Sequence, residues 1–118
     1  MTRPARGVSI AVLAAIGFLG LGGALGFRRS PEAALQLHVV EIRGMEFHPR
    51  ELEVHRGDTV LWINRDLVPH TATSTRKAGW NTGPLQEGDS GRYIPRHTGE
   101  DAYICQLHPV MRGKLLVR

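Results

Sequence analysis

Short apolar runs alternate with polar residues from Leu35 to the end of the chain, and Gly, Pro, Asp and Asn separate these runs. Alternation with a period of two is typical of a strand that buries one face, and no stripe with helical spacing accompanies it. The pattern predicts strands at residues 35–42, 51–54, 59–64, 101–105 and 114–118. Strands at these spacings, without helices between them, indicate an all-β domain built as a sandwich or barrel.

The larger apolar side chains of this region are candidates for its core. Trp62 lies on the inward face of a predicted strand, and we expect it to pack in the core together with Phe47. Met45 is also interpreted as core filler. Trp80 lies in a long polar stretch, residues 65–91, where only short strands are expected. A position in the core and a position in an apolar surface rim both remain open for Trp80.

The beginning of the chain has a different pattern, because residues 8–27 contain no charged residue over 20 positions. As a helix this segment would be about 30 Å long, which matches the hydrocarbon core of a membrane. A cleaved signal peptide would have a shorter apolar core, and Ala24 and Gly26 could supply its small-residue cleavage site. Arg28 and Arg29 follow directly, as in a segment that stays in the membrane. The sequence leaves both a signal peptide and an anchor helix open.

The charge distribution separates the same two parts of the chain. Residues 1–34 are predicted to be a signal peptide or membrane anchor plus a short linker, and residues 35–118 a single folded domain. The whole chain has a formal charge of +4, but the part from Leu35 onward holds 11 Lys and Arg residues against 10 Asp and Glu residues. This part has no Arg-rich stripe and no aromatic-basic motif, so nucleic acid is excluded as a partner.

Cys105 is the single cysteine, so no disulfide can form within the chain. It opens the segment Cys105-Gln106-Leu107-His108-Pro109-Val110-Met111, which places a thiolate, an imidazole and a thioether within seven residues at a strand end. Such a loop can wrap one metal ion. These donors suit copper, because the thiolate and thioether favour Cu(I) and imidazoles accommodate Cu(II). A second imidazole could come from His70, which follows the strand ending at Asn64 and can reach the same end of a sandwich.

These residues and their neighbours also carry a family resemblance. The motifs, in order, are Phe47-His48-Pro49, Val54-His55-Arg56-Gly57-Asp58-Thr59-Val60, Trp62-Ile63-Asn64, Pro69-His70-Thr71, Tyr103-Ile104-Cys105, His108 and Met111-Arg112-Gly113. With them, nearly the whole folded part resembles the cupredoxins of the plastocyanin, amicyanin and pseudoazurin group. The Cys-x-x-His-x-x-Met spacing is most similar to that of amicyanins. The resemblance implies a Greek-key β-sandwich and electron transfer by one copper ion that cycles between Cu(I) and Cu(II).

Carried over residue by residue, the resemblance implies a type 1 (blue) copper site. His70, Cys105 and His108 would be the three close ligands, and Met111 the long axial ligand. In many relatives an Asn follows the first His ligand; this sequence has Thr71 instead, which can still offer a backbone N–H and a hydroxyl group. The other histidines are interpreted as solvated or hydrogen-bonded surface residues: His38, His48, His55 and His97.

The resemblance also implies a function. Pro109 would belong to an apolar rim through which the exposed edge of His108 passes electrons to redox partner proteins, such as a cytochrome, a dehydrogenase or an oxidase. We expect a monomer without enzyme activity that is located outside the cytoplasm. A membrane tether through residues 8–27 stays open. A copper carrier or sequestering protein is the alternative. A zinc hydrolase or a copper oxidase-like enzyme is disfavoured because Met111 occupies the position that either would leave open, and zinc has little use for a thioether.

Overall fold

The computed structural model describes Gly23, Gly26 and residues 34–118. Apart from these two glycines, the predicted signal or anchor segment at residues 8–27 lies outside the described residues. Across the part of the chain that the structure describes, no helix has the length and apolar composition needed to cross a membrane.

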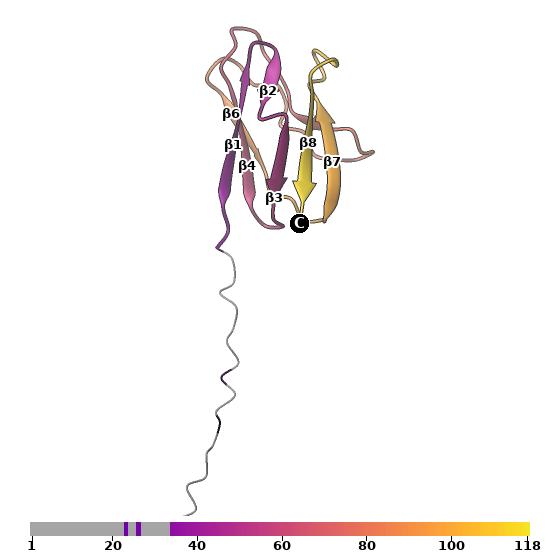
Figure 1. The fold of residues 1–118 in the computed structure, drawn as a ribbon. Helices are drawn as coiled ribbons and strands as arrows, with labels where there is room; N and C mark the ends of the chain where they lie inside the picture. Colours follow the sequence, from indigo (N-terminus) through magenta and orange to yellow (C-terminus); the bar gives the residue numbers. More distant parts are fainter. Residues whose placement is uncertain (1–22, 24–25, 27–33) are drawn as a thin grey trace, which may run out of the picture. The chain divides into compact units, whose positions relative to one another are not determined.

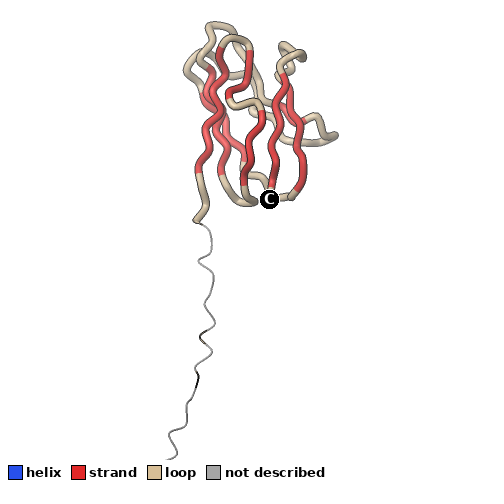
Figure 2. Tube along the Cα trace, in the orientation of Figure 1, coloured by secondary structure: helices blue, strands red, loops and turns tan. Residues whose placement is uncertain are grey.

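The folded part consists of β-strands joined by loops, and its described residues contain no helix (Figure 1 and Figure 2). The strands are β1 (Leu37–Arg43), β2 (Glu46–His48), β3 (Glu51–Val54), β4 (Thr59–Asn64), β5 (Thr73–Ser74), β6 (Ser90–Tyr93), β7 (Gly99–Ile104) and β8 (Arg112–Val117). The predicted strands are therefore all present, with bounds shifted by up to two residues at either end. The polar stretch at residues 65–91 holds only β5 and the start of β6, as expected.

Two four-stranded sheets form the domain, with strand orders β2-β1-β4-β6 and β3-β8-β7-β5. Strands β1 and β4 pair in parallel, as do β3 and β8, while the remaining pairs are antiparallel. The chain crosses between the sheets after β2, β3, β4, β5 and β6, so neighbours in a sheet are mostly distant in sequence. This is the all-β sandwich that the alternating pattern predicted.

The core lies between the sheets and is centred on aromatic side chains. Trp62 of β4 and Phe47 of β2 are almost fully buried, as predicted. Tyr103 of β7 packs edge-on against both rings, with centroids 4.7 Å from Phe47 and 5.4 Å from Trp62. Trp80 stacks on Trp62 with centroids 4.9 Å apart and on Tyr93 at 4.6 Å, which resolves its open assignment in favour of the core margin.

The Tyr103 side chain crosses the neighbouring strand β8 at Gly113, its direct partner in the sheet. A Cβ atom at position 113 would lie 2.2 Å from Cζ of Tyr103, far closer than any real contact. Only glycine therefore leaves room for the ring. This close approach, rather than a special backbone angle, explains why the motif after Met111 contains a glycine.

The prediction for Met45 is wrong. Its side chain is 40% exposed, because Met45 and Gly44 form the tight turn between β1 and β2. Both residues have a φ of 60°, the left-handed conformation. From the sequence, an apolar residue at this position is interpreted as a core residue, but the turn directs its side chain toward solvent. The three-residue strand β2 that follows was not predicted.

Candidate metal centre

The chemistry-bearing residues gather at one end of the sandwich, where β4 and β7 finish and β8 begins (Figure 1). His70 lies in the loop after β4, and Cys105 is the first residue after β7. His108 and Met111 lie in the loop that connects β7 to β8. Residues 35 positions apart in the chain are thus neighbours in space, as the sequence predicted from the order of strand ends.

Three of the predicted ligand side chains converge there. The Nδ1 atoms of His70 and His108 lie 3.7 Å and 3.8 Å from Sγ of Cys105, and the donor atoms of all three lie within 4.8 Å of one another. The two imidazole rings have centroids 5.0 Å apart. His70 and Cys105 are fully buried and His108 is half-buried, so one edge of the cluster faces the surface.

The separations fit one metal ion held by all three donors. Metal–nitrogen bonds of about 2.0 Å and metal–sulfur bonds of about 2.3 Å are usual for such ligands. With these bond lengths, sulfur–nitrogen separations of 3.7 Å and 3.8 Å subtend about 120° at the ion. A trigonal arrangement of two imidazoles and a thiolate is diagnostic of blue copper. The residues present therefore fit copper in both donor chemistry and spacing.

Met111 is held beside Cys105 by the backbone of its loop. The amide of Cys105 donates to the carbonyl of Met111 at 3.1 Å, and the amide of Met111 donates to the carbonyl of His108 at 2.9 Å. The amide of His108 in turn donates to the carbonyl of Cys105 at 3.3 Å. These bonds curl the seven-residue loop into a closed turn. Met111 is 3% exposed, so its side chain lies inside the protein.

Thr71 offers both groups that the sequence analysis expected of it. Its backbone N–H donates to Sγ of Cys105 at 3.3 Å. Its hydroxyl accepts a hydrogen bond from the amide of Gln106 at 2.9 Å and contacts the hydroxyl of Thr73 at 2.9 Å. Thr71 therefore ties the loop of His70 to the loop of Cys105, and its amide directs the positive end of its dipole toward the sulfur.

Asp66, which was not predicted from the sequence, holds the outer edge of the His70 ring. Oδ2 of Asp66 lies 2.9 Å from Nε2 of His70. The carboxylate also accepts hydrogen bonds from the amides of Gly44 at 2.7 Å and Met45 at 2.9 Å, which the left-handed turn presents to it. Asn64 completes the network, because its Oδ1 accepts the amide of Asp66 at 2.9 Å.

This network keeps Asp66 charged. Burial alone would raise the pKa of Asp66, but the hydrogen bonds from the Met45 amide, the His70 ring and the Gly44 amide outweigh it and lower the pKa. The side chain is only 17% exposed. Only its position four residues before His70 could have identified Asp66 in the sequence. This signal is weak, because a single acidic residue in a polar loop belongs to no periodic pattern.

Exposed apolar side chains lie close in sequence to His70 and His108. We call them the apolar rim; its members are Leu67, Val68, Leu107, Pro109 and Val110. They come from the two loops that carry His70 and His108. Leu67 is 82% exposed and Val110 is 87% exposed, so neither side chain packs against the core. An exposed apolar group of this kind indicates a contact surface.

Comparison with known protein families matches residues 34–118 to copper binding proteins of the plastocyanin/azurin family. The chain belongs to this family. Amicyanin of Paracoccus denitrificans is 34% identical over 96 residues, which cover 75% of this chain and 73% of that protein. Amicyanin-alpha of Methylorubrum extorquens is 26% identical over 121 residues, which cover 99% of each chain. The family match confirms the prediction of a copper-binding cupredoxin.

Solved structures agree with the fold. An amicyanin variant in its oxidised state superposes with a TM-score of 0.66 and 32% identity, over 70% of this chain and 82% of that one. A copper-containing nitrite reductase from Thermus scotoductus gives a TM-score of 0.63 and 29% identity, over 69% of this chain but only 22% of the reductase. The cupredoxin-like sandwich predicted from the sequence is thus confirmed.

Proposed function

We propose that this cupredoxin is a one-electron carrier with a type 1 copper site. His70, Cys105 and His108 are its close ligands, and Met111 is its long axial ligand. The observation that carries this proposal is the buried cluster of one thiolate and two imidazoles at separations suited to a trigonal ion. The bound copper supplies a centre that accepts and releases one electron.

The protein contributes rigidity to this site. His70 is held from behind by Asp66, and Cys105 accepts the Thr71 amide while its own amide bonds to the loop. Ligands that cannot move keep nearly the same positions in both oxidation states, so little rearrangement accompanies electron transfer. Burial of Cys105 also keeps water and oxidants away from the thiolate.

Electrons would enter and leave through His108, because it is the half-buried member of the cluster. The apolar rim around it suits transient docking of a redox partner protein, since small apolar contacts release water without the cost of desolvating charges. The partner is a cytochrome, a dehydrogenase or an oxidase in this proposal. The folded part carries nearly balanced charge, which gives electrostatic steering little share in partner choice.

Storage or delivery of copper is the alternative function, and the structure favours it less. A carrier must release its ion readily, which requires ligands that an acceptor can reach. Here His70 and Cys105 are fully buried, and Met111 is only 3% exposed. A site closed in this manner suits an ion that stays bound while its charge changes.

An enzyme function is not part of the proposal. The nitrite reductase that resembles this chain is a much longer protein, of which the chain covers 22%. The Cys105 to Met111 loop offers Met111 where a catalytic copper would need an open position for substrate. We therefore assign electron transfer without substrate turnover.

The proposed location is outside the cytoplasm, with the domain either free in the periplasm or tethered to the outer face of the cytoplasmic membrane. The uncharged segment at residues 8–27 supports export, and the arginines that follow it support retention as an anchor. The boundary between this segment with its linker, residues 1–34, and the cupredoxin domain, residues 35–118, is part of the same proposal. The domain acts as a monomer.

Optical and EPR spectroscopy of the copper-loaded protein tests the proposal. The oxidised protein should be intensely blue and should cycle reversibly. Cys105→Ser should abolish the blue absorption because the sulfur is its source, and Met111→Leu should keep copper but raise the reduction potential. Met45→Leu is the matched control, since the exposed Met45 side chain lies outside the site and leucine keeps the backbone amide that donates to Asp66; the substitution should change neither property.

Two results would contradict the assignment. A Cys105→Ser variant that remains blue would remove the sulfur from the ligand set. Stoichiometric zinc in protein isolated without added copper would end the electron-carrier proposal. Rapid loss of copper to a chelator, together with irreversible redox behaviour, would favour the carrier alternative.

A further inference from the structure

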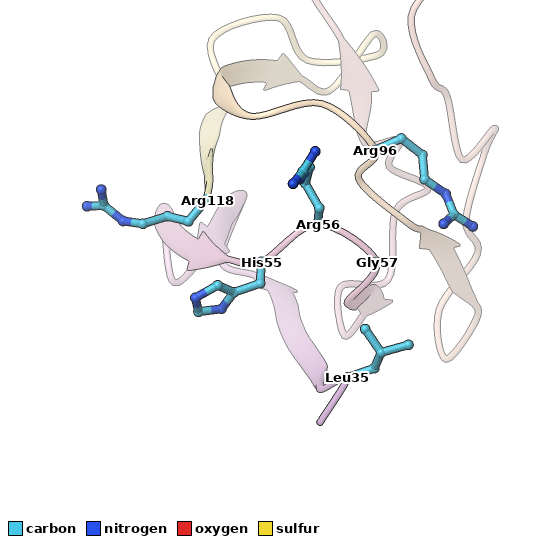
Figure 3. A pocket seen from close by; sticks show the side chains of 6 residues that line it. All are labelled: Leu35, His55, Arg56, Gly57, Arg96 and Arg118. Atoms are coloured by element: carbon cyan, nitrogen blue, oxygen red, sulfur yellow. The ribbon is translucent and has the colours of Figure 1, made fainter. Parts of the chain in front are cut away.

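A shallow, open hollow of about 560 Å³ lies in the surface at the end of the sandwich opposite the metal centre. None of its lining side chains is acidic, and four of them are basic; the lining consists of Leu35, His55, Arg56, Gly57, Arg96 and Arg118 (Figure 3). We call these residues the basic end. They come from the segment before β1, the turn between β3 and β4, the loop between β6 and β7, and the residue after β8.

Backbone hydrogen bonds hold these segments together. The amide of Arg56 donates to the carbonyl of Arg118 at 3.0 Å, and the amide of Gly57 donates to the carbonyl of Pro95 at 2.9 Å. Leu35 lies over Gly57, where an added Cβ would meet its side chain at 3.1 Å. The backbone segments of the basic end are thus fixed relative to one another by the fold of the domain.

Two of the three arginines of this face have no ion-pair partner among residues 34–118. Arg118 forms an ion pair with Glu53 at 2.7 Å. Within residues 34–118, neither Arg56 nor Arg96 has an ion-pair partner. Asp58, in the turn that also carries Arg56, is buried, and its oxygens accept hydrogen bonds from the amides of residues 36 and 55 and contact the His38 ring.

The arrangement of the guanidinium groups indicates what this face can bind. In Figure 3 the side chains of Arg56, Arg96 and Arg118 point in different directions and do not converge on one point. A small anion would need convergent donors to be held. Guanidinium groups spread over a face instead match negative charge that is itself spread over a surface.

The connection to the rest of the chain indicates which surface this is. Leu35, 72% exposed, lies at the basic end and directly follows the predicted linker. Residues 28–34 number seven, and even fully extended they reach at most about 25 Å from the predicted membrane segment. Leu37, the first residue of β1, lies two residues further along the chain and is 64% exposed. Leucines next to arginines are suited to a lipid interface.

We propose that the basic end docks on the anionic lipid surface next to the membrane anchor and thereby fixes the orientation of the domain. This inference rests on the tether in the proposed function. The six-residue strands β4 and β7 run from this end to the metal centre, a rise of about 20 Å. The docked domain therefore presents His108 and the apolar rim to the aqueous side, where a soluble redox partner can reach them.

Energy transfer in nanodiscs tests this orientation with the full chain, copper-loaded and reduced. Both tryptophans of the chain, Trp62 and Trp80, lie in the domain, so transfer to dansyl headgroup lipids measures how closely the domain approaches the membrane. Transfer should be higher in discs that contain phosphatidylglycerol than in pure phosphatidylcholine discs. The difference should disappear at about 1 M salt, where the Debye length is about 3 Å.

The variant R56Q/R96Q should lose this preference for anionic discs. Each arginine removed should lower the ratio of docked to detached domain about fivefold, the equivalent of about 1 kcal/mol, and both together about 25-fold. The matched control is R43Q/R112Q, which removes two exposed arginines from the end that carries the metal centre. This control should keep the preference.

Three results would overturn the inference. The first is equal energy transfer on the two kinds of disc, and the second is an equal loss of the preference for anionic discs in both double variants. The third is release of the full chain from neutral discs by salt, which would show that no membrane anchor holds it. The proposed function fails in a different way, through a missing blue absorption or a missing reversible potential. Both double variants should keep a blue absorption and a reversible potential, so the failures are distinguishable.

Discussion

Asp66 accepts a hydrogen bond from Nε2 of His70 at a distance of 2.9 Å. An ionised carboxylate can only accept, so Nε2 carries the proton of the neutral imidazole and Nδ1 presents its lone pair. Nδ1 is the atom that lies 3.7 Å from Sγ of Cys105. Asp66 therefore sets the tautomer and the orientation that a metal ligand requires, and it adds a negative charge next to the proposed copper ligand.

Asp66→Asn should raise the reduction potential of the copper centre. Removal of a negative charge beside His70 favours the less positive Cu(I) state, and we expect a rise on the order of 60 mV, a tenfold change in the redox equilibrium. A redox titration followed by the blue absorption measures this change. Asp66→Glu restores the charge and should return the potential part of the way.

Asp89→Asn is the control for this prediction, because Asp89 is an exposed carboxylate of the loop before β6 with no contact to His70. Its potential should stay close to that of the unmodified protein. An Asp66→Asn potential equal to that of Asp89→Asn would mean that Asp66 supports the loop without influencing the metal.

Thr71→Val should weaken the connection between the two ligand loops. Valine keeps the backbone N–H that donates to Cys105 but loses the hydroxyl that accepts the Gln106 amide. We expect the free energy of unfolding to fall by about 1 to 2 kcal/mol, the usual cost of a lost partner in a largely buried hydrogen bond. Chemical denaturation of the copper-loaded protein measures this loss.

Because the amide to sulfur bond survives in Thr71→Val, its blue absorption should change little. Thr98→Val is the matched control, since Thr98 is exposed and lies in the loop before β7. Equal stability of the Thr71 and Thr98 variants would show that the hydroxyl has no structural role.

Much of the fold was predictable because the buried positions alternate. Trp62 on β4 has inward neighbours at every second position, and this pattern needs no knowledge of the partner strands. Met45 was misassigned because the sequence does not reveal the left-handed turn that points it outward. Trp80 stayed open because it reaches the core from a loop, by stacking on residues of other strands.

The candidate site divides in the same way. Cys105, His108 and Met111 are neighbours in sequence and carry distinctive donors, so their grouping is visible in the chain itself. His70 was predicted to join them from its place after a strand end. Asp66 was not predicted, because its role arises from three contacts that exist only once the turn at Gly44 has folded against its loop.

Gly113→Ala should destabilise the sandwich without touching the metal donors. The added methyl group would collide with the Tyr103 ring, whose Cζ lies 2.2 Å from the position of the new Cβ. The ring or the strand must shift, and overpacking of this kind costs about 1 to 3 kcal/mol. Thermal or denaturant unfolding of the variant measures the cost.

A double-mutant cycle with Tyr103→Leu identifies the cause of that cost. Leucine removes the colliding part of the ring, so the alanine at position 113 should be less costly in the Tyr103→Leu background than in the unmodified protein. An alanine cost that is the same in both backgrounds would place the effect elsewhere, for instance in the backbone of β8.

Asp58 should make the stability of the protein depend on pH in the acid range. It is 2% exposed, and burial alone would raise its pKa, but hydrogen bonds from the amides of Gln36 and His55 and from the His38 ring lower the pKa to about 2. A carboxyl group with a pKa below its ordinary 3.8 stabilises the folded state when it is ionised. Its contribution is therefore complete above about pH 4 and is lost as the pH falls toward 2.

The size of this contribution is about 2 kcal/mol, from a shift of nearly two pH units at 1.36 kcal/mol per unit. Asp58→Asn should be less stable than the unmodified protein at pH 7, and its free energy of unfolding should fall less steeply between pH 4 and pH 2. Unfolding of the metal-free protein at a series of pH values measures both effects without copper release. Glu87→Gln, which changes an exposed carboxylate, should retain the full slope. Parallel plots of unfolding free energy against pH for the Asp58 and Glu87 variants would mean that the acid sensitivity arises at other carboxylates. The hydrogen bonds of Asp58 with Gln36, His38 and His55 would then contribute nothing to it.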